Sequence, residues 1–176
     1  MAGWTAPAVS RRQPRLVANE REALEEWLDF HRATLLSKCS GLAPAHLCER
    51  AVPPSNLSLL GLVRHMTEVE RFWFRRHVAR EEVGHLYCSP EQPEADFELL
   101  EEERAREDLA RFEAEVALAR AAAAAHDLDE QFPSRGHHPE RVRDLRWIYL
   151  HMLEEYARHN GHADLLRQAI DGSTGT

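Results

Sequence analysis

Four polar side chains share one face of a segment that otherwise has the pattern of an amphipathic helix, LHMLEEYARHNGHADLLR at residues 150–167. At about 100° per residue, His151, Glu155, His159 and His162 occupy an arc of roughly 80°. Glu155 and His159 stand four residues apart, so their side chains lie one turn from each other. A buried carboxylate without a partner costs several kcal/mol, and a metal ion is one partner that offsets this cost. The spacing therefore indicates a candidate metal site.

Two more histidines are expected to point inward from other helices. His65 lies between Leu62 and Val69 on the apolar stripe of LLGLVRHMTEVERFWF, so the stripe predicts that it points inward and could supply a third ligand. His31 occupies an inward position on the stripe of an earlier helix. Histidines from three helices, together with one glutamate, make a constellation that a metal ion would explain.

Simpler interpretations exist for each of these residues. A single inward histidine such as His31 is more often a hydrogen-bonded core residue than a ligand. His151 and His162 are also compatible with a role as hydrogen-bond partners of the ligands, and Glu155 with His159 can form a plain hydrogen-bonded pair. The other histidines considered lie at expected helix ends or in loops, where we expect solvation: His77, His85, His126, His137 and His138.

Four amphipathic segments must position these groups, and chain breakers separate them. The expected helices span about residues 19–40, 55–80, 97–126 and 141–170. Ser55 or Asn56 is expected to cap the second helix, and Trp27 belongs to the inward stripe of the first. No segment alternates with period two, so no sheet is expected. The pattern predicts an all-α, four-helix bundle with long loops covering one end.

The totals favour one domain over residues 1–176, with residues 1–17 as a flexible lead-in and 171–176 as a frayed tail. The formal net charge of −8 opposes electrostatic binding of nucleic acid. No stretch approaches the roughly 20 apolar residues of a membrane span, and the N-terminus lacks a secretory apolar run. We therefore expect a cytoplasmic protein, with no nucleic-acid or membrane partner. Among the 22 basic residues only Lys38 is a lysine, which is typical of a GC-rich bacterial source.

Two stretches resemble a known family: LLGLVRHMTEVERFWFRR and LRWIYLHMLEEYARHNGHADLLRQAIDGSTG. They are similar to the DinB-like superfamily of four-helix-bundle metalloproteins, in the branch related to mycothiol-dependent maleylpyruvate isomerase and thiol S-transferases. The resemblance covers about residues 20–175. The family takes one metal ligand from the second helix and two, four apart, from the last, which implies His65, Glu155 and His159 here. Glutamate in the middle position resembles the isomerase variant.

The resemblance implies a metal-dependent thiol S-transferase. A divalent ion, zinc first and nickel, manganese or iron as alternatives, would activate a mycothiol-type thiol for attack on a small electrophile. His31, His151 and His162 are then candidates to orient ligands or move protons. Arg158 lies beside the ligands and is a candidate contact for the thiol cosubstrate.

Other functions remain open at this point. The bundle could carry a metal and bind or cyclise a small molecule without a thiol. Two histidines and a carboxylate also describe the Fe(II) oxygenase triad, although all three ligands here come from helices. A structural protein with a vestigial polar core is the simplest alternative. A homodimer through exposed aromatic residues such as Phe72 or Trp147 is also left open.

Overall fold

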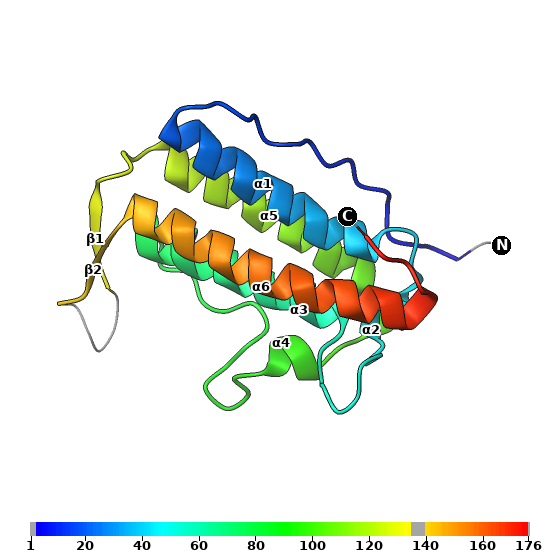
Figure 1. Ribbon diagram of the computed structural model, residues 1–176. Coiled ribbons are helices and arrows are strands. Elements are labelled where there is room, and N and C mark those ends of the chain that lie inside the picture. The colour runs from blue at the N-terminus through cyan, green and yellow to red at the C-terminus, as the bar shows by residue number, and fades with distance from the viewer. Residues whose placement is uncertain (1–2, 135–139, 176) are drawn as a thin grey trace.

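Four long helices pack side by side in the computed structural model, which describes residues 3–134 and 140–175 (Figure 1). They are α1 (Glu20–Cys39), α3 (Leu59–Glu70) with its π-helical continuation η1 (Arg71–Val78), α5 (Ala105–Ala124) and α6 (Leu145–Asp171). Helix α1 packs mainly against α6, and α3 packs mainly against α5. The predicted all-α fold class is therefore confirmed. None of the helices in these residues is long and apolar enough to cross a membrane.

Short elements connect the long helices. They are α2 (Pro44–Cys48), α4 (Ala95–Glu98), the 3-10 turn η2 (Glu102–Arg104), and the strands β1 (Gln131–Pro133) and β2 (Val142–Asp144). Helix α2 lies near one end of the bundle, whereas the segment that carries α4 runs along the side of α3 (Figure 1). The long connections therefore cover a flank of the bundle as well as an end.

Side-chain caps decide where the helices begin. Asn19 and Glu22 form a capping box at α1, as the expected start at residue 19 requires. The cap of α3 is Ser58, whose Oγ accepts from the backbone N–H of Gly61 at 3.1 Å. The expected caps Ser55 and Asn56 were therefore wrong, because Ser58 stands immediately before the apolar run that forms the helix.

The sequence expectation of no sheet was wrong. Strands β1 and β2 pair antiparallel just before α6, with Phe132 opposite Arg143. Phe132 is buried in the core, and its neighbours in the strand are exposed. Three residues are too few for a period-two pattern to stand out. Because the second strand takes residues 142–144, α6 begins at Leu145 and not at residue 141.

The third long helix also begins later than residue 97. Residues 95–104 form α4 and η2, because this segment is held against the outer face of α3. Arg64 of α3 donates to the backbone carbonyls of Ala95 and Leu99. Glu68 accepts backbone N–H bonds from Leu86 and Tyr87, each at 2.7 Å, in the same connection. Two charged side chains of α3 therefore fix the loop that runs beside it.

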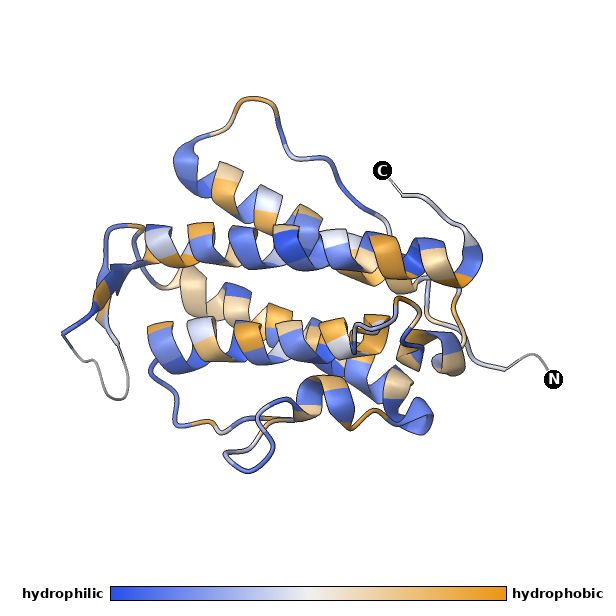
Figure 2. Ribbon diagram, turned by 60° about the horizontal axis from the view of Figure 1, so that its bottom comes forward, coloured by the Kyte–Doolittle hydropathy of each residue, from blue (hydrophilic) through white to orange (hydrophobic). Residues whose placement is uncertain are grey.

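The core lies between the four helices, each of which carries both hydrophobic and hydrophilic residues (Figure 2). Its large, fully buried side chains include Leu28, Leu35, Leu62, Met66, Phe112 and Ile148. Trp27, expected to face inward, is 47% exposed, so the inward stripe of α1 is narrower than predicted. The segment before α1 pairs with the end of that helix, since Ala6 exchanges backbone hydrogen bonds with Gly41 and Leu42.

A buried ion pair joins three of the four helices. The Nε and Nη2 atoms of Arg32 donate to the two carboxylate oxygens of Glu70, each at 2.7 Å. The hydroxyl of Tyr156 donates to the same carboxylate at 2.7 Å. Glu70 and Tyr156 are 0% exposed. Because a buried carboxylate is tolerated only with such partners, this cluster fixes how α1, α3 and α6 sit against one another.

Helix α3 changes its winding immediately after Glu70. Residues Arg71–Val78 form the π-helix η1, which packs against α5. Arg71 and Arg75 of this segment both donate to Glu115 of α5, and Glu115 is 5% exposed. A buried carboxylate shared by two arginines therefore joins η1 to α5.

Replacing Glu70 by alanine is expected to lower the free energy of unfolding by about 3–5 kcal/mol, because the Arg32 guanidinium stays buried without its counter-charge. Chemical denaturation followed by circular dichroism measures this change. The control is Glu107→Ala, which removes an exposed pair with Arg111 and should cost less than about 1 kcal/mol. Equal losses in the two variants would contradict the structural importance given to the buried pair.

Candidate metal centre

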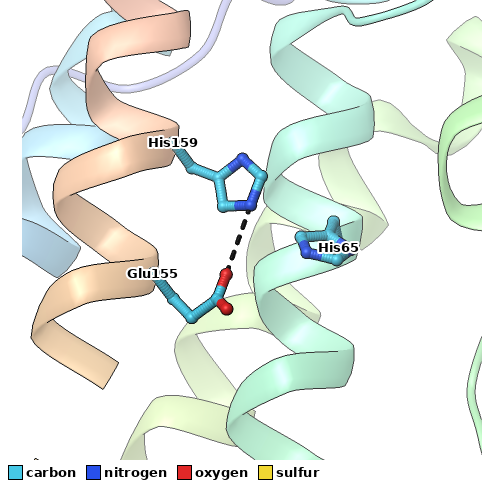
Figure 3. Close-up of side chains that lie close together, drawn as sticks. All are labelled: His65, Glu155 and His159. Carbon is cyan, nitrogen blue, oxygen red and sulfur yellow. Dashed lines mark ion pairs between the residues drawn. The ribbon is translucent and has the colours of Figure 1, made fainter. Parts of the chain in front are cut away.

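Helices α3 and α6 bring together three of the side chains singled out in the sequence. One ligand atom each from His65, Glu155 and His159 can be chosen so that all three lie within 4.8 Å of one another. Figure 3 shows the Glu155 carboxylate directed toward the His159 ring, with His65 facing both from the neighbouring helix. The rings of His65 and His159 have centroids 4.8 Å apart. The predicted constellation of these three residues therefore exists as a cluster in space.

The distance between the two α6 groups is informative. Glu155 Oε2 and His159 Nε2 lie 3.5 Å apart, which is longer than an ordinary hydrogen bond. Ligands at about 2.0–2.1 Å from a tetrahedral zinc ion are about 3.4 Å from each other. The pair is thus spaced as two ligands of one ion would be, which does not favour the simpler hydrogen-bonded interpretation.

Asp96 holds His65 in one orientation. Its Oδ2 lies 2.9 Å from His65 Nδ1, and the Asp96 side chain is only 5% exposed. An ionised carboxylate accepts a hydrogen bond from an Nδ1 that carries the proton. In that tautomer Nε2 has no proton, and its lone pair is free to bind a metal. This is the arrangement in which a second carboxylate orients a metal-binding histidine.

Phe97 completes the wall beside His65. Its ring stacks on the imidazole with centroids 4.9 Å apart and planes 28° apart. The close approach needs Gly61 of α3, because a Cβ there would lie 3.1 Å from the Phe97 ring. Sequence reasoning missed both Asp96 and Phe97, since they lie in a connection without periodicity. The only available signal was an aspartate beside an aromatic residue in that loop.

His159 is poised as a neutral ligand. Burial, followed by the charges of His65 and His162, lowers its pKa to about 4. The imidazole is therefore uncharged at neutral pH, and the neutral form is the one that binds metal. His162 lies one turn along α6, with its Nδ1 3.4 Å from His159 Nδ1. His162 therefore contacts His159 without belonging to the three-residue cluster.

His151 contacts the same cluster from the other side of Glu155. Its Nε2 is 3.7 Å from Glu155 Oε1, so the two oxygens of this carboxylate face different imidazoles. The His151 ring is stacked on Trp147, with centroids 5.0 Å apart and planes 14° apart. The Trp73 ring packs against the same imidazole, with centroids 4.8 Å apart and planes 70° apart. Packing thus holds the orientation of this ring.

His31 and Arg158 lie outside the cluster. Asn160 reaches His31 on the α1–α6 seam, where its Nδ2 lies 3.2 Å from His31 Nδ1 and donates to the His31 carbonyl. Burial lowers the pKa of His31. Within residues 3–134 and 140–175, no contact joins it to the three clustered side chains, which favours the core-histidine interpretation. The Arg158 side chain is 60% exposed and pairs with Glu154.

The five histidines that were expected at helix ends or in loops divide into three groups. His77 was expected in solvent, but it is 2% exposed and packs beside Phe72 and Trp73, because η1 turns it inward. The side chains of His85 and His126 are 47% and 23% exposed, and both stand near carboxylates. His137 and His138 lie outside the described residues.

Comparison with known proteins adds one result. A family model described as mycothiol-S-transferase matches residues 23–172, which include the four long helices almost entirely and all three clustered side chains. Among curated proteins, no relative matches the chain.

Replacing Asp96 by asparagine is expected to weaken zinc binding by about tenfold to a hundredfold, because a neutral amide, which can donate as well as accept, replaces the charged acceptor that fixes the tautomer of His65. Competition with a chromophoric chelator measures the affinity. The matched control is Asp127→Asn, a change of the same kind at an exposed position. An unchanged zinc affinity in the Asp96 variant would refute this role for the carboxylate.

Proposed function

Because the chain belongs to the mycothiol-S-transferase family, within the DinB-like superfamily, we propose that it is a divalent-metal-dependent transferase of a mycothiol-type thiol. The observation that carries the metal part of this proposal is the convergence of His65, Glu155 and His159. Two imidazoles and one carboxylate supply three protein ligands and leave a position open for a substrate. Zinc suits this donor set best, and nickel, manganese and iron also suit it.

A divalent ion in this position would bind the sulfur of the thiol and favour its ionised, nucleophilic form. Without such help, a thiol of pKa about 8.5 is only slightly ionised near neutral pH. The reaction forms a bond between sulfur and the carbon of an electrophile, while the leaving group departs with its electron pair and the thiol proton goes to a base.

The cysteines of the chain do not supply a reactive sulfur. Burial raises the pKa of Cys39 to about 12, and burial likewise raises the pKa values of Cys48 and Cys88 to about 11. All three thiols are therefore protonated at neutral pH and weakly nucleophilic. This supports a thiol that arrives as a cosubstrate.

Residues around the cluster would complete the site. His162 neighbours His159 and is partly exposed, so it would accept the thiol proton or steady the ligand. His151 would fix the Glu155 carboxylate from its second oxygen. Arg158 lies at the surface one position before His159, where it would contact the polar body of the thiol.

The ligand variants test the proposal directly. Protein purified without a histidine tag should transfer a mycothiol-type thiol to a chlorodinitrobenzene with release of chloride. His65→Ala and Glu155→Ala should lose metal and reduce this activity by more than about a hundredfold, because each removes a protein ligand. His46→Ala, at an exposed position of α2, should change neither. Full metal content and full activity in Glu155→Ala would refute the mechanism.

A spectroscopic test separates this function from a metal-bearing bundle that works without a thiol. Cobalt(II) in place of the native ion should show a sulfur-to-metal charge-transfer band when the thiol is added, because the sulfur enters the open position. His65→Ala protein should not develop the band. An unchanged spectrum in the parent protein, at thiol concentrations that support turnover, would favour the thiol-free alternative.

A further inference from the structure

Glu155 is placed between two histidines in the manner of a bridging ligand. Its Oε2 lies 3.5 Å from His159 Nε2, and its Oε1 lies 3.7 Å from His151 Nε2. Both separations exceed hydrogen-bond distance, yet both approach the spacing of about 3.4 Å between ligands of one tetrahedral ion. Among the described residues, these two imidazoles are the polar contacts of the carboxylate. One ion between Glu155 and His159 explains the first of these distances, but it does not explain why His151 stands at a similar distance from the other carboxylate oxygen.

The second histidine is held ready for a ligand. Trp147 stacks on the face of His151, and the Trp73 ring packs against it with the two planes 70° apart, so the His151 ring cannot turn freely. The His151 side chain is 24% exposed, so it is not sealed inside the core. An imidazole that is fixed by aromatic packing and directed at a carboxylate is preorganised for metal binding.

Glu154 supplies a third donor. One ligand atom each from His151, Glu154 and Glu155 can be chosen so that all three lie within 4.8 Å of one another. Glu154 Oε1 accepts a hydrogen bond from Arg158 at 2.9 Å, whereas its Oε2 lies 3.7 Å from His151 Nδ1, the ring nitrogen opposite the one that faces Glu155. The two carboxylates bring two negative charges to this position, and these charges favour a divalent cation.

We propose that His151, Glu154 and Glu155 hold a second divalent cation, and that Glu155 bridges it to the ion held by His65 and His159. The inference rests on the proposed function, because the first ion belongs to that function. Carboxylate-bridged pairs place their ions roughly 3.5–4 Å apart. The imidazole and carboxylate donors select a first-row ion such as zinc or manganese.

Equilibrium dialysis against low-micromolar zinc, followed by elemental analysis, tests the second site. The parent protein should retain two ions per chain. His151→Ala and Glu154→Gln should each retain one, because they leave His65, Glu155 and His159 in place. His46→Ala and Glu113→Gln, at exposed positions of α2 and α5, should still retain two. Glu154→Gln changes an exposed side chain, so it tests the site without disturbing the aromatic packing.

The outcomes separate the two proposals. No bound ion in the parent protein would refute the metal centre and the second site together. One ion in the parent protein would overturn the second site and keep the first. Two ions that persist in both His151→Ala and Glu154→Gln would place the second ion elsewhere, which also overturns the inference. With two equivalents of manganese(II), an exchange-coupled electron paramagnetic resonance signal is expected, and two isolated-ion signals would contradict the bridge.

Discussion

The buried carboxylate of Glu70 is the constraint on which the rest of the bundle depends. It needs Arg32 from α1 and Tyr156 from α6, so three helices must meet at one depth and in one rotation. Tyr156 then faces the core, and Glu155, about 100° around the helix, is turned toward the side that meets α3. The relative positions of His65, Glu155 and His159 therefore depend on a buried ion pair that includes none of these three residues.

The flank of α3 sets the other half of the cluster. Arg64 and Glu68 tie the following connection to the helix through its backbone, and that connection carries Asp96. The carboxylate that orients His65 therefore lies on the short helix α4, which Arg64 holds against α3 through the backbone carbonyls of Ala95 and Leu99. Because such bonds tolerate varied side chains, the loop can differ in sequence while the imidazole keeps its orientation.

Helical periodicity predicted the bundle and turned His65, Glu155 and His159 inward, while the resemblance to the DinB-like superfamily selected these three from a larger set of inward polar groups. It could not predict Asp96, because the position of the four-residue helix α4 depends on hydrogen bonds between distant segments. It also placed His31 with the cluster, because a stripe shows which side is inward without showing which neighbour is met there. The three-residue strands were too short for any period to register.

The π-helix η1, which continues α3, determines the directions in which the side chains after Glu70 point. An extra residue within a helix shifts every later side chain by about 100° relative to the earlier ones. The π-helix η1 begins directly after Glu70, which is buried, and contains Trp73, whose ring packs against His151. Deleting one residue from η1 would leave a helix there, but it would rotate the later side chains of η1 relative to the buried ion pair of Glu70.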